Sequence, residues 1–196
     1  MQAVIDSIEK REINAEIVKV ISSKSDVYAL ERAKNANIAT DVVDRKNYNS
    51  DIEFDRALLE SLKECGAELI VLGGFLRIFS EEFIEAYRNK IINVHPSLIP
   101  SFCGKGFYGL KVHEAAIAAG VRITGATVHF VDEGCDSGPI ILQKAVCVKQ
   151  GDDAESLQKK VMEQAEWVLL PKAIGLIADG HVSLKHGRVI LREKRV

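Results

Sequence analysis

The chain has 196 residues, of which 47% are hydrophobic and 28% charged, and its net charge at pH 7 is −2. These numbers indicate one soluble globular domain with a real core and no global basic field that would attract nucleic acid or an anionic membrane. No apolar run reaches the roughly 20 residues of a membrane-spanning helix, the N-terminus lacks signal-peptide organisation, and the four cysteines have no metal-like spacing, so we expect a cytoplasmic protein with free thiols.

The chain opens with an amphipathic stretch, MQAVIDSIEKREI, and then alternates short β-branched runs with amphipathic stretches. The expected strands are Glu16–Ser22, Ala39–Asp44, Leu69–Gly73, Ile91–Val94, Ile123–Val131 and Ile140–Val148. The expected helices are Val27–Asn35, Ser50–Cys65, Ser80–Asn89, Leu110–Ala119 and a long one at Ala154–Ala178. Ser80 predicts a helix cap, Gly66 and Gly120 predict left-handed helix ends, and Pro171 is expected to kink or divide the long helix.

The alternation of strands and helices predicts the fold class. The run LIVLG is apolar on both faces, as a parallel strand covered by helices on both sides must be. We therefore expect a doubly wound, mostly parallel, Rossmann-like α/β sheet with helices on both faces, followed by a C-terminal hairpin in VSLKHGRVIL. Such folds normally open with a strand, so a first strand is expected to be absent in front of Met1.

Two segments carry residue types suited to acyl transfer. In IINVHPSLIPSFCGKGF, Asn93 and His95 lie two residues apart on a strand and therefore face one side. An amide and an imidazole fixed in this way can hold a carbonyl oxygen that becomes negative. In TVHFVDEGCDSGPIILQ, Asp132, Glu133 and Asp136 crowd a returning loop, and a carboxylate beside an imidazole stabilises its protonated form.

The residue types alone leave other interpretations open. One is a satisfied polar strand end with a solvated acidic turn. Another is a metal site of His95, His113 and Asp136, which no ligand spacing supports.

The longer motifs are more specific. NVHPSLIPSF, GATVHFVDEGCDSGPIILQ and GGFLRIFS together resemble the folate-dependent formyltransferase superfamily, and most closely its glycinamide ribonucleotide transformylases (phosphoribosylglycinamide formyltransferases). The resemblance runs along the whole chain. It implies transfer of a formyl group from 10-formyltetrahydrofolate to the amine of glycinamide ribonucleotide in purine synthesis, with no metal. It implies that Asn93 holds the formyl oxygen, that His95 is the catalytic imidazole, and that Asp136 supports His95 and moves a proton through water.

The resemblance also implies binding residues. Glu166 matches an acid that contacts the ribonucleotide, and His113 matches a histidine near the catalytic pocket, with a helix-surface histidine as the alternative. The residues matching the reduced-folate site are Leu76, Arg77, Ile78, Phe79, Asn93, Asp132, Glu133, Gly134, Cys135 and Asp136.

Some positions depart from the family pattern. Residues 1–6 match the middle of the family's first helix, so the strand and turn that hold the substrate phosphate are expected to be absent, which would leave a gap in the sheet. We expect residues 1–196 to form a single, N-terminally truncated formyltransferase domain. Asp51 stands where the family has an arginine near the folate tail, and Lys111 replaces a common histidine.

The alternative functions are two other enzymes of the same superfamily and one non-enzymatic role. Formyltetrahydrofolate deformylase shares the three reacting residues, and so does methionyl-tRNA formyltransferase, which adds an RNA-binding domain. An inactive fragment that binds folate or a nucleotide is a third possibility, because of the missing strand. The expected partners are small molecules only, with no nucleic acid and no membrane, in a monomer or a homodimer.

Overall fold

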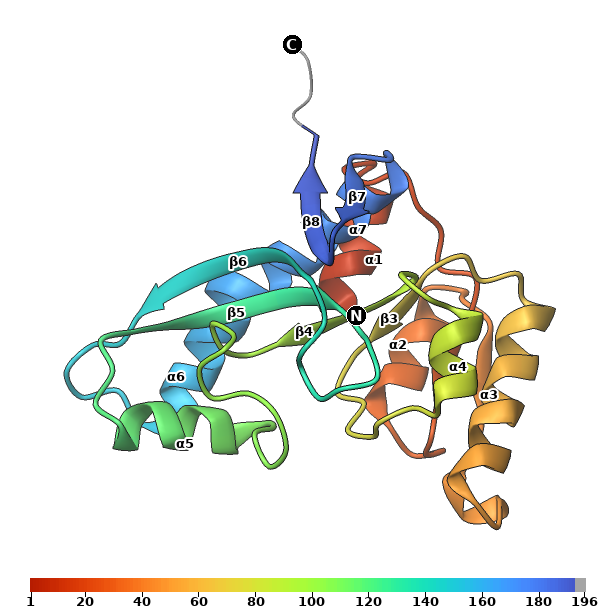
Figure 1. Cartoon of the computed structure of the whole chain (residues 1–196), viewed down its shortest axis with the longest axis horizontal. Helices are drawn as coiled ribbons and strands as arrows, with labels where there is room; N and C mark the ends of the chain where they lie inside the picture. Colours follow the sequence, from red (N-terminus) through yellow and green to blue (C-terminus); the bar gives the residue numbers. More distant parts are fainter. Residues whose placement is uncertain (193–196) are drawn as a thin grey trace.

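The protein has an α/β fold, described by a computed structural model for residues 1–192 (Figure 1). The strands are β1 Val20–Ser22, β2 Thr40–Val42, β3 Ile70–Leu72, β4 Ile91–His95, β5 Ile123–Phe130, β6 Ile140–Cys147, β7 Val182–Lys185 and β8 Arg188–Leu191. The helices are α1 Gln2–Glu9, α2 Tyr28–Asn35, α3 Asp51–Glu64, α4 Glu81–Ala86, α5 Leu110–Ala118, α6 Ala154–Val161 and α7 Trp167–Ala178. Within residues 1–192, none of the helices has the length and apolar character needed to cross a membrane.

The helix ends form where the sequence signals predict them. The Ser80 hydroxyl accepts a hydrogen bond from the Phe83 N–H, which satisfies one free donor at the start of α4. Gly66 and Gly120 follow α3 and α5 with φ of +65° each, the left-handed conformation that glycine adopts without a Cβ clash. The cap and both helix ends are therefore confirmed.

The strands form separate ladders. β1 pairs with β2 in parallel, while β3, β4, β5 and β6 form a four-stranded sheet. In that sheet β3–β4 is parallel, but β4–β5 and β5–β6 are antiparallel. The α/β class is confirmed, and the parallel pairing is limited to β1–β2 and β3–β4. β6 runs against β5 because residues 131–139 return the chain without the crossover helix that a parallel neighbour needs.

The sheet is interrupted between β1 and β3, which is the gap expected from the sequence. Across the described residues, 1–192, no ladder joins these two strands. Val71, in the middle of β3, has 39% of its surface exposed, although a strand covered on both faces should be buried. The strands of the N-terminal part of the sheet are therefore not joined into one ladder, whereas β3 to β6 are hydrogen-bonded in sequence.

Helices cover both faces of the four-stranded sheet, as expected. Successive residues of β4 point to opposite faces. Ile91 belongs to a core cluster with Phe54 of α3 and Phe83 of α4, whereas Ile92 belongs to a second cluster with Leu157 of α6. Two hydrophobic cores thus hold β4 between two helix layers.

The C-terminal region matches the expectation in part. The long helical stretch is divided, but by a π-helical turn at Met162–Glu166. Pro171 lies inside α7, so the helix is not divided at this proline. Pro171 has no N–H to donate to the preceding turn, yet the helix continues through it. The β7–β8 hairpin is confirmed, with His186 and Gly187 both at positive φ in its turn.

Candidate functional site

One face of the β4–β5 pair carries the polar residues of the site. In the antiparallel register, Asn93 lies opposite His129 and His95 lies opposite Thr127. Directly opposed residues share a face and lie close together. The alternate residues, such as Ile92, pack into the core on the other face. The period of the strand therefore places Asn93 and His95 on the face opposite to that of Ile92.

His95 is held at both ring nitrogens. It is 4% exposed, with Nε2 2.9 Å from the Phe102 carbonyl oxygen and Nδ1 3.4 Å from Asp136 Oδ2. The Phe102 carbonyl is a hydrogen-bond acceptor for Nε2, and the Asp136 carboxylate lies at ion-pair distance from Nδ1. The predicted convergence of His95 and Asp136 is thus observed, although it comes from segments 41 positions apart in the chain.

Asp136 reaches His95 from the loop at residues 131–139. Its φ is +56°, and its Oδ2 accepts a hydrogen bond of 2.9 Å from the Gly104 N–H. Burial acts to raise the pKa of the Asp136 carboxyl. The hydrogen bond from the Gly104 N–H and the attraction of His95 act in the opposite direction, and the pKa of the Asp136 carboxyl lies below its ordinary value. Asp136 is therefore a carboxylate at neutral pH.

The path of that loop depends on Gly138. A Cβ at this position would lie 1.9 Å from the Phe130 carbonyl oxygen, far inside van der Waals contact. At the same place, the Phe130 N–H donates to the Pro139 carbonyl. The loop can leave β5 this closely, and so present Asp136, because residue 138 has no side chain.

A buried hydroxyl ties the segment after β4 to β5. Thr127 Oγ1 donates to the Ser97 carbonyl at 2.7 Å and accepts from the Ile99 N–H at 3.1 Å and from Gln143 Nε2 at 3.0 Å. This segment continues to Phe102, whose carbonyl contacts His95. Thr127 and Gln143 therefore help to hold the chain that orients the imidazole.

His113 lies on α5 beside this centre and is fully buried, so a helix-surface histidine is excluded. Neither ring nitrogen has a hydrogen-bond partner within the part of the chain that the structure describes. Burial, followed by repulsion from His95, lowers the pKa of His113 to about 4. His113 is consequently neutral at pH 7. Among residues 1–192, no three His, Cys, Asp or Glu side chains are grouped so as to hold a metal ion.

The segment expected to bind folate divides into exposed and buried residues. Leu76 and Ile78 are 67% and 59% exposed, whereas Phe79 is buried in the core between the rings of Phe75 and Phe83. The side chain of Phe79 is therefore not available to a ligand. Arg77 donates to Asp51, which also accepts from Arg45 at 2.7 Å. Asp51 thus forms ion pairs with two arginine side chains, Arg45 and Arg77.

The acidic loop is folded on itself. Asp132 Oδ1 accepts from the Gly134 N–H at 3.1 Å and from the Ser137 hydroxyl at 2.7 Å. Glu133 forms an ion pair with Arg88 at 2.8 Å, and Cys135 is exposed. Of the acids in this loop, Asp136 is the one in contact with the two site histidines.

Glu166 lies on a different element, at the last position of the π-helical turn. Burial raises the pKa of Glu166 to about 7, and the amino group of Met1 acts in the opposite direction. π-turns occur often at functional sites because they redirect one side chain of a helix. The structure therefore gives Glu166 an environment unlike that of a solvated helix face.

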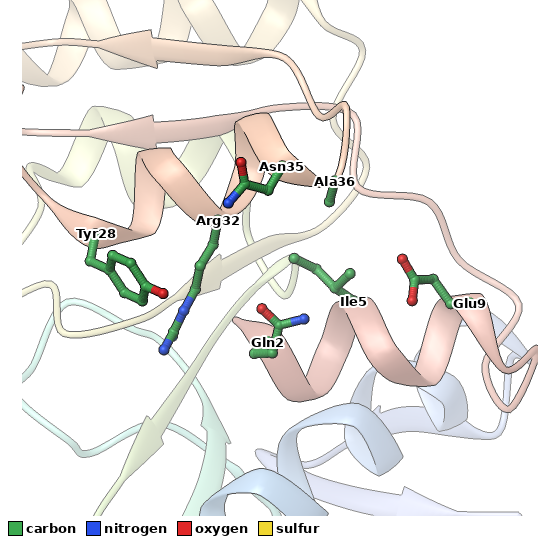
Figure 2. Close-up of a pocket in the computed structure, with 7 residues that line it drawn as sticks. All are labelled: Gln2, Ile5, Glu9, Tyr28, Arg32, Asn35 and Ala36. Atoms are coloured by element: carbon green, nitrogen blue, oxygen red, sulfur yellow. The ribbon is translucent and has the colours of Figure 1, made fainter.

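A separate pocket lies between α1 and α2 (Figure 2). Its volume is about 190 Å³, and the Arg32 guanidinium lies 4.5 Å over the Tyr28 ring at its wall. It contains none of the residues predicted to react or to bind folate. Its lining residues are Gln2, Ile5, Glu9, Tyr28, Arg32, Asn35 and Ala36.

Two residues of the site were missed from the sequence. His129 Nε2 lies 3.3 Å from Asn93 Nδ2 and 3.7 Å from Asp136 Oδ1, and Thr127 organises the segment after His95. Their spacing was visible, because Thr127 and His129 are two apart on a predicted strand, as Asn93 and His95 are. What the sequence lacked was the register that places the two pairs opposite each other.

Comparisons with known proteins show which chains and folds this chain is similar to. Residues 1–174 match the family described as formyl transferase. Phosphoribosylglycinamide formyltransferase from Haemophilus influenzae is 37% identical over 99% of this chain and 89% of its own. The crystal structure of glycinamide ribonucleotide transformylase 1 from Symbiobacterium toebii has a TM-score of 0.92 and 38% identity, covering 98% of this chain and 88% of that one.

A longer relative is similar over the same region. The trifunctional purine biosynthetic protein adenosine-3 of Gallus gallus is 46% identical over 94% of this chain, which spans 18% of that protein's length. A family match over most of the chain, together with relatives of similar length, establishes the family. The chain belongs to the formyl transferase family.

Proposed function

We propose that this chain transfers a formyl group from 10-formyltetrahydrofolate to the amine of glycinamide ribonucleotide. The observation that carries the proposal is the meeting of His95 Nδ1 and Asp136 Oδ2 at 3.4 Å, beside Asn93, in a member of the formyl transferase family. The choice of glycinamide ribonucleotide as the substrate is supported by the names of two relatives, phosphoribosylglycinamide formyltransferase and glycinamide ribonucleotide transformylase.

The first step is attack of the substrate amine on the formyl carbon. A C–N bond forms, and the formyl oxygen takes the negative charge. One N–H of the Asn93 amide and the protonated His95 imidazole stabilise that charge in a site where His95 is almost completely buried. The contacts of His95 with Phe102 and Asp136 hold the ring in place before reaction, so that little reorganisation is needed.

The second step moves a proton. The attacking nitrogen becomes positive when it bonds to carbon, and it must lose a proton before the intermediate collapses. Asp136 can take up this proton through water because it is ionised at neutral pH, its pKa lying below the ordinary value. The bond from carbon to the folate nitrogen then breaks, the C=O bond re-forms, and Asp136 returns the proton through water to the departing nitrogen.

Other residues form the proposed binding surfaces. The exposed side chains of Leu76 and Ile78 suit an apolar ring system, and the backbone at Phe79 offers hydrogen-bonding groups. Arg77 and the loop at residues 132–136 complete the folate side in this proposal. Glu166 is proposed to contact the ribonucleotide, and the same proposal includes a cytoplasmic location, a single domain at residues 1–196, no metal, and a monomer or homodimer.

The decisive experiment is a formyl-transfer assay with 10-formyltetrahydrofolate, run with glycinamide ribonucleotide and with water alone. We expect formylated product to depend on the ribonucleotide, and Asn93→Ala to abolish most of the turnover. Formate release at the same rate without the ribonucleotide would identify a deformylase. Folate binding by calorimetry with no turnover in either arm would identify a binding module and would contradict the proposed reaction.

A further inference from the structure

His129 is buried and has polar contacts at both of its ring nitrogens. Its side chain is 2% exposed, and its Nδ1 lies 2.8 Å from the Phe130 carbonyl oxygen. A carbonyl can only accept, so the contact with Phe130 places a proton on Nδ1. The pairing of β5 with β6 shifts register between Val128 and His129, and a bulge of this kind re-aims the side chain that follows it.

The free nitrogen of the ring faces the reacting centre. Nε2 lies 3.3 Å from Asn93 Nδ2, which is hydrogen-bonding range, and 3.7 Å from Asp136 Oδ1, which is beyond it. An amide nitrogen can only donate, so in this contact Nε2 accepts one N–H of the Asn93 amide. The other N–H and the carbonyl of that amide are then left for a ligand.

The Asn93 amide requires such an anchor. Rotation about the last bond of an asparagine side chain is broad and roughly two-fold, so β4 alone does not decide where the amide points. A donor that stabilises an oxyanion must be aimed before the charge develops. In the structure, the contact that aims the Asn93 amide comes from His129, its direct cross-strand neighbour.

We propose that His129 is a positioning residue for formyl transfer, whose Nε2 holds the Asn93 amide so that its second N–H points to the acyl oxygen. The inference rests on the proposed function, because it deepens the role of Asn93 in the same site. His129 itself touches neither substrate. It acts through Asn93, and by occupying the space between Asn93 and Asp136 it keeps the amide and the carboxylate apart.

Two variants separate this role from ordinary packing. In His129→Gln, the amide oxygen occupies the region of Nε2 and can still accept from Asn93. In His129→Asn, the shorter side chain retains a group near Nδ1 that can donate to the Phe130 carbonyl, but the contact with Asn93 is lost. Both variants remove a buried imidazole, and the change in Tm of each variant measures its loss of packing.

We expect His129→Asn to lower kcat by about 10- to 100-fold, because a misaimed oxyanion donor loses much of its effect, with KM for both substrates changed less than about threefold. His129→Gln should retain kcat within about fivefold of the wild-type value. Equal losses of kcat in the two variants, in proportion to their losses of Tm, would show a structural role and overturn the proposal.

A second measurement keeps the inference independent of the assay and of variant folding. ¹⁵N spectra of the wild-type protein should show His129 protonated on Nδ1 and unprotonated on Nε2, and the Asn93 side-chain amide signal should shift in His129→Asn and be largely restored in His129→Gln. A proton on Nε2 in the wild-type protein would overturn the positioning role. These spectra distinguish failure of the proposed reaction from failure of the positioning role. If the spectra agree with these expectations but the wild-type protein transfers no formyl group, the proposed reaction is wrong and the contact between His129 and Asn93 is still supported.

Discussion

The two halves of the sheet differ in how completely their strands are paired. β1, β2 and β3 have three residues each, and the sheet is interrupted between β1 and β3. β5 and β6 have eight residues each, and β5 is paired along both edges. Asn93, His95 and their cross-strand partners lie in the well-paired half, whereas Leu76 and Ile78 follow the short strand β3 and are exposed.

This difference indicates a division of labour. Electrostatic stabilisation requires donors that are aimed before the reaction, and a strand paired on both edges with two cores around it supplies that rigidity. Ligand-binding surfaces tolerate exposure and movement, and in the proposed function such a surface lies on the exposed segment after β3. Loss of a group in the well-paired half should therefore change turnover, and changes in the open half should have smaller effects on it.

The largest expected effect is loss of the His95–Asp136 pair. His95→Ala and Asp136→Asn should each lower formyl transfer by about 10²–10³-fold, since each removes a charge that stabilises the transition state. Asparagine tolerates the positive φ of residue 136 and can still accept from the Gly104 N–H, so the loop should keep its shape. Folate affinity, measured by fluorescence titration, should change far less. Near-normal turnover in either variant would contradict the assigned roles.

Glycine substitutions compare the two halves directly. Gly138→Ala would place a Cβ 1.9 Å from the Phe130 carbonyl, and we expect it to lower the free energy of unfolding by about 3 kcal/mol, as overpacking against backbone does. Gly73→Ala, after β3, meets no atom within 4 Å and is the matched control, with an expected change below about 0.5 kcal/mol. Urea unfolding of both variants measures the difference. Similar midpoints would show that the loop at residues 131–139 can move freely.

Substitutions at Thr127 test the hydrogen bonds that hold the segment between His95 and Phe102. Thr127→Val removes the hydroxyl that bonds the Ser97 carbonyl and the Ile99 N–H, and leaving such buried groups unpaired should cost about 2 kcal/mol of stability. Turnover should also fall, by about tenfold, because the segment that positions Phe102 loosens. Thr127→Ser keeps the hydroxyl and should recover most of both quantities. Full activity in Thr127→Val would separate this network from catalysis.

The smallest expected effect is the pH dependence contributed by Glu166. The folded protein keeps this proton up to a pKa of about 7, whereas the unfolded chain releases it near the ordinary value of 4.5. The folded state binds more protons between these values, so stability falls as pH rises from about 4.5 to 7. Partial exposure limits the effect to on the order of 1 kcal/mol. In Glu166→Gln, urea midpoints across this range should lose that decline; an unchanged decline would assign it to other groups.

The sequence by itself determined the local parts of this protein. Strand–helix alternation gave the α/β class because the period of apolar residues reports local burial. The caps at Ser80, Gly66 and Gly120 followed from the backbone chemistry of those residues. The placement of Asn93 and His95 on one face followed from the two-residue period of a strand. The family resemblance added the partner Asp136, which local patterns alone left among three acids.

Only the tertiary structure decided how distant segments meet. The register of β4 with β5 places His129 opposite Asn93, and the path of the loop brings Asp136, rather than Asp132 or Glu133, to the two histidines. Folding also buried His113 and divided the last helix ahead of Pro171. The physical reason is range: propensity and periodicity act within a few residues, whereas register, loop closure and burial are fixed by contacts between segments that the local pattern does not pair.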